Sequence, residues 1–261
     1  MIKSFKVMNQ SKEDYEWLHF IRNAEFETAL NFFPVEKNIK ILEIGGGDGF
    51  IAKKIHDLGY KITAMDQMPK YPQHFSVSTG NASKLDFESE TFDIIFSSHV
   101  LAHVNEIEMF FSESKRVLKK NGLMIHIVPS TTWSIGTNFW HYVLLPKFFI
   151  EWKRSKMIST DNSNKNININ KKEKIVTRII NILFLHPLGV NPSFIHEFYY
   201  FSKYKWKKIF QNQGFKILSI ENGPYFYTGH NILKNKFLRL RKILSKIGFT
   251  GSFCFILKIN F

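Results

Sequence analysis

Short apolar runs alternate with longer stretches in which apolar residues recur every three or four positions. The short runs predict buried strands at residues 39–44, 61–66, 74–78, 92–97 and 123–128. The longer stretches predict helices before Pro34, at 50–58 and at 106–119, and Asn121-Gly122 marks the end of the last one. Strands that alternate with helices form parallel sheets covered on both faces. The pattern therefore predicts an α/β fold with a doubly wound, Rossmann-like sheet.

The alternation pauses after residue 130 and resumes near residue 202, where a helix (203–213) and strands (215–220 and 252–259) are expected. In between, an aromatic cluster precedes a polar segment at 159–170, predicted to be a mobile loop, and a helical stretch at 175–185. We expect this insertion to cap the substrate site. The alternative is that it thickens the fold or forms a dimer contact. The chain is predicted to have four parts: a leading helical segment (1–38), a core (39–130), a cap insertion (131–201) and the end of the core sheet (202–261). The last part contains an insertion at 222–248, in which a basic helix is expected at 231–246.

The first predicted strand ends in a run of glycines. Gly45, Gly47 and Gly49 form a G-x-G-x-G pattern, and Phe50 leaves the dinucleotide pattern G-x-G-x-x-G incomplete. No Gly-Lys-Ser/Thr follows, which excludes a nucleoside-triphosphate P-loop. Glycine allows positive φ and close approach of a ligand, and the following helix offers unpaired N–H groups. The turn is therefore predicted to bind polar or anionic atoms of a ligand.

The segment 42–49, Leu-Glu-Ile-Gly-Gly-Gly-Asp-Gly, resembles the first motif of class I S-adenosylmethionine-dependent methyltransferases of the type 11 (ubiquinone/menaquinone methyltransferase-like) family. Gly-Asn-Ala-Ser-Lys-Leu-Asp-Phe (80–87), Ser-His-Val-Leu-Ala-His-Val (98–104) and Arg-Val-Leu-Lys-Lys-Asn-Gly (116–122) are similar to later motifs of that family. The resemblance implies S-adenosyl-L-methionine as the cofactor and a seven-stranded, mostly parallel sheet with an antiparallel last strand. Residues 196–202 and 227–230 resemble a bacterial subgroup linked to cell-surface glycan pathways, which implies a glycan acceptor.

An acidic residue at the end of the second strand is the next expected cofactor contact. Asp66 lies 21 residues after Gly45, a spacing at which a carboxylate accepts both ribose hydroxyls of an adenosine. The resemblance also implies that Glu43 lies beside the methionine part and that Asn81, where Asp is common, accepts the adenine amino group. The complete predicted set is Glu43, Gly45, Gly46, Gly47, Gly49, Asp66, Gln67, Asn81, Ala82, Ser97 and Ser98.

Histidine is the side chain best suited to deprotonate a hydroxyl acceptor near neutral pH. His99 and His103 follow the fourth strand, beside the expected methyl group, and are the predicted catalytic residues, although His103 alternatively caps or packs its helix. The residues predicted to contact the substrate are His141, His186, Glu197, Tyr227 and His230, with His196 a further candidate. No spacing such as H-E-x-x-H is present, and no metal is predicted.

Composition places the chain among globular proteins, with 44% hydrophobic residues and 27 Phe in 261 residues. The single Cys254 excludes an intrachain disulfide and a Cys-based zinc site, and it suits a reducing cytoplasm. We expect no secretory signal and no membrane-spanning segment. Of the net charge of +14, residues 1–130 contribute −2 and residues 131–261 contribute +16. This basic half favours nucleic acid, an anionic membrane or an acidic substrate, unless it reflects compositional bias alone.

These features predict a cytoplasmic methyltransferase that O-methylates a small molecule or a glycan precursor, with peripheral contact to the inner face of an anionic membrane as an additional expectation. An RNA methyltransferase is an alternative supported by the basic half, but no Asn/Asp-Pro-Pro-aromatic signature is present. A non-catalytic, cofactor-binding protein at the membrane surface is the other alternative.

Overall fold

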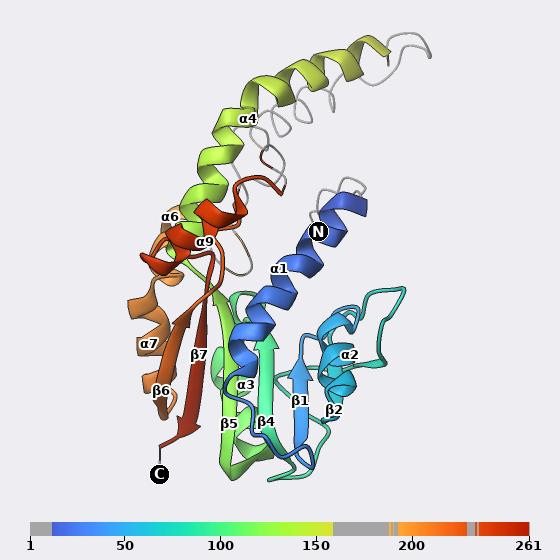
Figure 1. Ribbon diagram of the computed structural model, residues 1–261, viewed down its shortest axis with the longest axis vertical. Helices are drawn as coiled ribbons and strands as arrows, with labels where there is room; N and C mark the ends of the chain where they lie inside the picture. Colours follow the sequence, from blue (N-terminus) through green and yellow to red (C-terminus); the bar gives the residue numbers. More distant parts are fainter. Residues whose placement is uncertain are drawn as a thin grey trace, which may run out of the picture.

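The computed structural model describes residues 12–158, 188, 190, 193–228, 233 and 235–260. In this part of the chain, seven strands form one sheet with helices on both faces (Figure 1). The strands are β1 (Lys40–Ile44), β2 (Lys61–Asp66), β3 (Val77–Thr79), β4 (Phe92–Ser98), β5 (Leu118–Pro129), β6 (Phe215–Asn222) and β7 (Ser252–Ile259). The helices are α1 (Lys12–Leu30), α2 (Phe50–Asp57), the 3-10 helix η1 (Leu101–His103), α3 (Ile107–Val117), α4 (Thr131–Ile158), α6 (Phe194–Tyr200), α7 (Lys203–Asn212) and α9 (Leu238–Lys246).

The strand order is β3-β2-β1-β4-β5-β7-β6. Strands β1 to β5 pair in parallel, and β7 runs antiparallel to both of its neighbours, β5 and β6. Strands β2 and β3 lie on one side of β1, and β4 and β5 lie on the other, so the strand order reverses at β1. Proteins with such a switch point bind ligands there, at the carboxyl ends of the strands. The predicted Rossmann-like, mostly parallel sheet with an antiparallel last strand is confirmed.

Four predicted elements have boundaries that differ from those in the structure. The helix predicted at 106–119 ends at Val117, because Leu118 already pairs with Phe92 and begins β5. Asn121 and Gly122 therefore lie within a strand that was expected to begin at residue 123. The third strand is Val77–Thr79 rather than 74–78, and within the predicted basic helix 231–246 the described helix α9 begins at Leu238.

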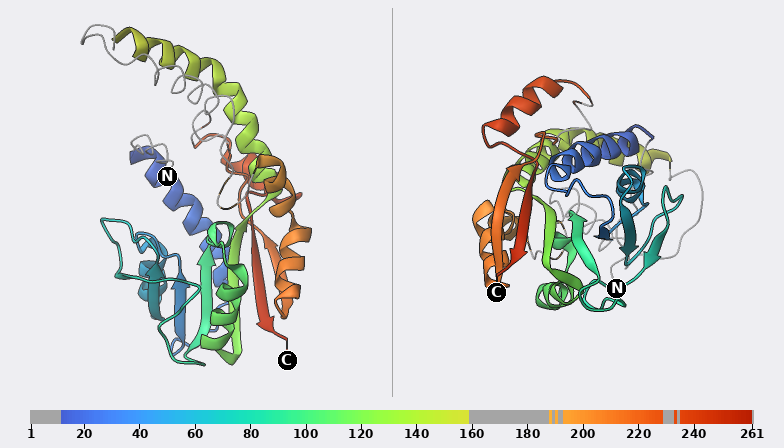
Figure 2. Two further views of the ribbon diagram at one scale, coloured as in Figure 1. Left: turned by 180° about the vertical axis from the view of Figure 1, so that it is seen from behind. Right: turned by 60° about the horizontal axis from the view of Figure 1, so that its bottom comes forward.

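Alternation of side chains along the strands divides the core into two layers, one on each face of the sheet. In β5, Met124 and Val128 belong to the cluster that includes α3 and α7, whereas Ile125 and Ile127 belong to the cluster that includes α1 and α2. Figure 2 shows these helix pairs on opposite faces of the sheet. The result is a three-layer arrangement that holds the strand ends rigidly at one edge.

Helix α1 is the leading helix predicted from the sequence, and it connects the core to the edge of the sheet where the strands end. Its second half buries Phe26 and Ala29 against the sheet. Its first half extends past the carboxyl ends of β1 and β4 (Figure 1). This placement lets polar residues of α1 reach any ligand bound at those ends.

Helix α4 leaves the carboxyl end of β5 and projects away from the sheet (Figures 1 and 2). It contains the aromatic cluster predicted in the cap insertion, and Pro146 lies inside it. The predicted loop at 159–170 and helical stretch at 175–185 lie outside the described residues, so the cap remains a prediction. Across the residues that are described, helices long and apolar enough to span a bilayer are absent.

Candidate active site

A cavity of about 650 Å³ lies at the carboxyl ends of β1, β2 and β4. Its walls come from the first half of α1, the glycine turn after β1, the end of β2 and the loops after β3 and β4. This is the location expected at the switch point of a doubly wound sheet, and the volume lies within the usual range of small-molecule sites.

The glycine turn forms the floor of the cavity, and two of its glycines are required sterically. Gly45 has a φ of +80°, and a Cβ there would lie 2.1 Å from Val100 Cγ2. Gly49 has a φ of +77°, and a Cβ there would lie 2.5 Å from the backbone oxygen of Phe75. By contrast, a Cβ on Gly47 would meet no atom within 4 Å, so only its φ of +57° favours glycine. The turn therefore keeps backbone, rather than side chains, next to the bound ligand.

Glu43 ends β1 with its carboxyl group inside the protein. Burial raises the pKa of Glu43 to about 8, and the negative charges of Asp48 and Asp66 add to the effect. Its Oε2 atom is buried and has no hydrogen-bond partner among the described residues. A buried acceptor of this kind is costly unless a ligand supplies a donor or a positive charge. Glu43 is therefore suited to the cationic methionine part of a cofactor.

Asp66 joins the end of β2 to the glycine turn. One carboxylate oxygen accepts the Gly47 N–H at 2.9 Å, and the other accepts the Met68 N–H at 2.8 Å. Asn81 lines the cavity, and its side-chain oxygen, the atom expected to accept the adenine amino group, accepts the Ser83 N–H at 2.9 Å. Most of the predicted cofactor residues line the cavity: Glu43, Gly45, Gly46, Gly47, Asp66, Gln67, Asn81, Ala82 and Ser98.

Two predicted cofactor residues are not in the cavity lining. Gly49 follows the part of the turn that lines the cavity and is the N-cap residue of α2. Ser97 is fully buried on the α3–α7 face, where its hydroxyl lies 2.7 Å from His126 Nδ1. That imidazole packs beside Phe110 and Phe210, and burial lowers the pKa of His126 to about 3. Ser97 is thus engaged in a neutral pair inside the core, and the strand reaches the cavity only at Ser98.

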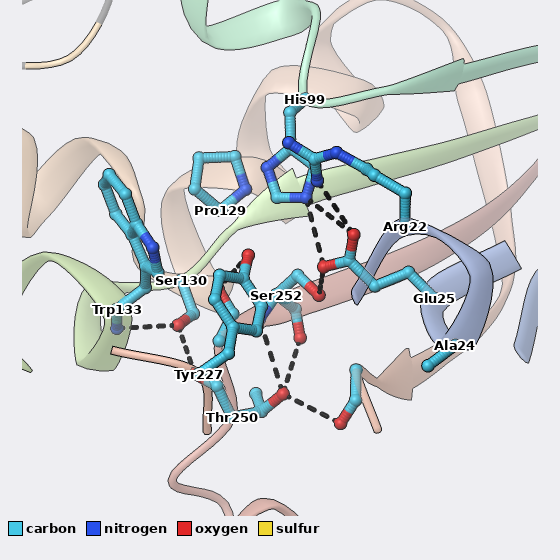
Figure 3. A network of polar contacts seen from close by, with 12 residues as sticks. Arg22, Ala24, Glu25, His99, Pro129, Ser130, Trp133, Tyr227, Thr250 and Ser252 are labelled. Carbon is cyan, nitrogen blue, oxygen red and sulfur yellow. Dashed lines mark hydrogen bonds and ion pairs between the residues drawn. The ribbon is translucent and has the colours of Figure 1, made fainter. Parts of the chain in front are cut away.

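His99 takes part in a buried network that links α1, the loop after β4 and β7 (Figure 3). His99 Nε2 lies 3.1 Å from both carboxylate oxygens of Glu25. Arg22 donates to Glu25 Oε2 at 2.8 Å, and the Ser252 hydroxyl donates to Oε1 at 2.5 Å. His99 itself has a φ of +59°, a left-handed conformation that non-glycine residues rarely adopt. Such strain is typical of functional positions.

The network sets the charge states of Glu25 and His99. Burial acts to raise the pKa of Glu25, but His99 and Arg22 outweigh it and lower that pKa to about 2. Burial, followed by the positive charge of Arg22, lowers the pKa of His99, and Glu25 compensates only in part. Near neutral pH, Glu25 is therefore ionised and His99 is neutral, with Nε2–H donating to the carboxylate.

The other predicted catalytic and substrate residues are distributed over the molecule. His103 ends η1 and lines the cavity, and burial followed by Arg22 lowers its pKa. Glu197 of α6 is buried outside the cavity lining, and its carboxylate accepts the Leu188 N–H at 2.8 Å. Tyr227 adjoins Glu25 and Ser252, and burial raises its pKa well above the usual value. His141 lies on α4, outside the cavity lining, and His186 and His230 lie outside the described residues.

Helix α1 contributes functional residues that the sequence patterns did not reveal. Tyr15, Leu18, His19 and Arg22 line the cavity, and Glu25 holds His99 from the next turn. Their spacing of three and four residues puts them on adjoining turns of one helix side. The signal in the sequence was Glu25, an acidic residue on the side of the helix that carries the apolar Ile21, Phe26 and Ala29.

Comparison with known proteins agrees with this geometry. A family model described as "Methyltransferase domain" matches residues 42–126. A protein of Pelagibacter ubique named "Ubiquinone biosynthesis O-methyltransferase" is 28% identical over 217 residues, covering 64% of this chain and 90% of that protein. One of the same name from Bartonella tribocorum is 27% identical over 127 residues, covering 44% of this chain and 50% of that protein.

Among solved structures, a SAM-dependent methyltransferase from Archaeoglobus fulgidus has the same fold, with a TM-score of 0.52 and 13% identity. The match covers 94% of this chain and 100% of that one. The predicted family, enzyme class and cofactor are thereby confirmed. Residues 42–126 of the chain form a methyltransferase domain.

Proposed function

We propose that the protein methylates a hydroxyl group of a small, largely apolar molecule and that His99 is the base for this reaction. The buried pair of Glu25 and His99 at the cavity wall carries the proposal, because it holds a neutral imidazole in one orientation. The relatives named as O-methyltransferases of ubiquinone biosynthesis support an oxygen acceptor on a small molecule.

The cavity fits the cofactor on two independent grounds. The Oε2 atom of Glu43 is a buried acceptor without a partner among the described residues, as expected for a site that receives a cation. A Cβ on Gly47 would meet no atom within 4 Å, so this turn of the cavity floor leaves open space where a side chain would otherwise obstruct a ligand. Asp66 at the end of β2 lines the same cavity as Asn81 and Ala82, which supports assigning Asp66 to the ribose hydroxyls and the other two to the base.

S-adenosylmethionine supplies a methyl group already activated on its sulfonium, so the protein has to position the reactants and exclude water. Glu25 accepts the Nε2–H of His99, which leaves Nδ1 as the proton acceptor. The His99 side chain is 11% exposed and lines the cavity, and we assign the proton-accepting role to its Nδ1. Nδ1 takes the hydroxyl proton, the Glu25 carboxylate stabilises the resulting imidazolium, and Arg22 holds that carboxylate in position.

The lining next to His99 favours an apolar acceptor over a glycan. Leu18 of α1 and Val100 and Val104 of the loop after β4 give this part of the wall its apolar surface, and His103, Asn105 and Glu106 line the cavity from the same loop. Apolar side chains bind flat aromatic or aliphatic groups well, whereas a glycan would need a polar partner for each hydroxyl. A phenol is therefore the proposed type of acceptor. Glycan precursors and RNA, the other acceptors considered from the sequence, serve as the competing substrates in the test.

The test is an assay with methyl-labelled S-adenosylmethionine against three probes: a panel of mono- and dihydroxylated phenols, a nucleotide-activated sugar and total RNA. We expect label in a phenol. Label in the sugar or RNA alone would overturn the proposed acceptor.

With the phenol, His99→Asn should lower kcat by about 10² to 10⁴, with the cofactor dissociation constant unchanged within a few fold. His103→Asn reveals whether the neighbouring histidine is the base instead, and His56→Asn, at an exposed position of α2, controls for loss of an imidazole.

The pH profile separates a base from a structural residue. Because the pKa of His99 is lowered, the acidic limb of kcat/KM should lie below pH 6.5. Glu25→Gln removes the charge that partly raises this pKa, so the limb should move to still lower pH while kcat falls. An unchanged limb in Glu25→Gln, or full activity in His99→Asn, would refute the assigned role.

A further inference from the structure

A second group of titratable side chains contacts α1 nearer to its start than the Glu25 network does. His19 of α1, Asp48 of the glycine turn and His74 of the loop before β3 come from three separate segments of the chain. One ligand atom from each lies within 4.8 Å of the others. The chemistry assigned above to His99 and the acceptor does not use any of the three.

The distances in this group are close to those of a metal site. A zinc ion bonds to His nitrogen and carboxylate oxygen at about 2.0–2.2 Å, which places tetrahedral ligands about 3.3 Å apart. His19 Nε2 lies 3.0 Å from Asp48 Oδ2. The Tyr15 hydroxyl lies 2.6 Å from the same oxygen and 3.1 Å from His74 Nε2. His74 is exposed, so its ring can turn toward an ion without disturbing the core.

The side chains are also held in place from outside the group. The His19 ring stacks on Phe50, with centroids 3.9 Å apart and planes 8° from parallel. Asp48 Oδ1 accepts the Phe50 N–H at 3.1 Å, which directs Oδ2 toward the histidines. The backbone N–H of His74 donates to the Asp48 carbonyl at 2.7 Å. Contacts of this kind orient ligands before a metal arrives and increase affinity.

We propose that His19, Asp48 and His74 form a binding site for a divalent transition metal of the zinc type, with Tyr15 or water in the fourth position. Two imidazoles and one carboxylate are a ligand set that suits zinc, whereas magnesium and calcium prefer oxygen ligands alone. The bound ion fastens α1 to the glycine turn. Tyr15, His19 and Asp48 all line the cavity, so the ion closes one wall of the cofactor site.

The experiment uses the purified full chain after treatment with a chelator. Zinc is titrated by calorimetry, and cobalt is titrated by visible absorption, which reports tetrahedral coordination. We expect one equivalent to bind with micromolar or tighter affinity to the wild type. His74→Ala should weaken binding by at least about tenfold, the typical range for loss of a residue that supports a metal. The matched control is His56→Ala, because His56 is also exposed and also lies beside a carboxylate, at 3.6 Å from Asp57.

The outcomes separate a metal site from a hydrogen-bonded group without metal. Binding of one equivalent in the wild type and His56→Ala, together with tetrahedral cobalt bands lost in His74→Ala, supports the proposal. Weak binding at many sites, or equal binding by wild type and His74→Ala, overturns it. His19→Gln keeps a hydrogen-bond donor to Asp48 but removes a zinc ligand, so unchanged zinc affinity in this variant also overturns it. Melting temperatures without metal confirm that each variant is folded.

Discussion

Glu43 provides the sharpest test of the cofactor site, because its ionisation should change when the cofactor binds. In the free protein, burial and the charges of Asp48 and Asp66 raise the pKa of Glu43 to about 8. At pH 7 roughly 90% of the molecules then have this carboxyl protonated. The methionine part of S-adenosylmethionine carries an ammonium and a sulfonium, and positive charge near a carboxylate lowers its pKa. Binding should therefore expel the proton from Glu43.

The expected size of this effect follows from the pKa. Close to one proton, about 0.9, should be released for each cofactor bound at pH 7, and about half a proton at pH 8. Calorimetry in buffers of different ionisation enthalpy measures this number directly. Glu43→Gln should bind the cofactor more weakly and without proton release. Glu36→Gln removes a carboxylate at an exposed position and should behave like the wild type.

The same substitution should have the opposite effect on the stability of the free protein. The folded pKa of Glu43 is raised above the unfolded value of 4.5, so the folded state is penalised as pH rises from 4.5 toward 8. At pH 7 this penalty is on the order of 3 kcal/mol, and Glu43→Gln removes it. Urea unfolding without cofactor should therefore show a more stable variant at pH 7. Equal heats in all buffers for the wild type, or a less stable variant, would refute the reasoning.

Two further predictions concern stability. Gly47→Ala should cost about 1–2 kcal/mol because of its left-handed backbone alone, whereas Gly45→Ala should cost clearly more because its Cβ would overlap Val100; equal losses in urea unfolding would contradict this. Glu25→Gln should lower the free energy of unfolding by about 3 kcal/mol at pH 7. The pKa of Glu25 is about 2 in the folded protein, below the unfolded value of 4.5. The difference in unfolding free energy between wild type and Glu25→Gln should therefore shrink to about 1.4 kcal/mol at pH 3. A difference that does not vary with pH would contradict the ion pair.

Much of the fold and the cofactor side of the site could be predicted from local patterns. An apolar run that ends in glycine identifies a buried strand and its turn, because both features lie within a dozen residues of sequence. Asp66 was predictable for a related reason: successive parallel strands end at the same edge of the sheet, so the last residue of β2 must lie beside the turn after β1.

For Ser97, the alternation of side chains along a strand predicts the direction of the side chain, which the family motif does not. Side chains two residues apart in a strand share a face, so Ser97 must lie on the same face as Ile95. Ile95 belongs to the α3–α7 cluster, and Ser97 accordingly meets His126 in the core. The family resemblance placed both serines at the cofactor because it carries no information on which way each one points.

The acceptor side could not be predicted because its contacts join residues that are distant in sequence. Glu25 bonds to His99, 74 residues away, and to Ser252, 227 residues away. Apolar spacing predicts that α1 is a helix and which side packs on the sheet, but it treats Arg22 and Glu25 as exceptions to that pattern. A charge on the buried side of a helix needs a partner elsewhere in the fold, since burying it alone would cost several kcal/mol. Such an exception is therefore itself a signal: it indicates that the helix covers a polar site, and in this protein that site is the one with His99.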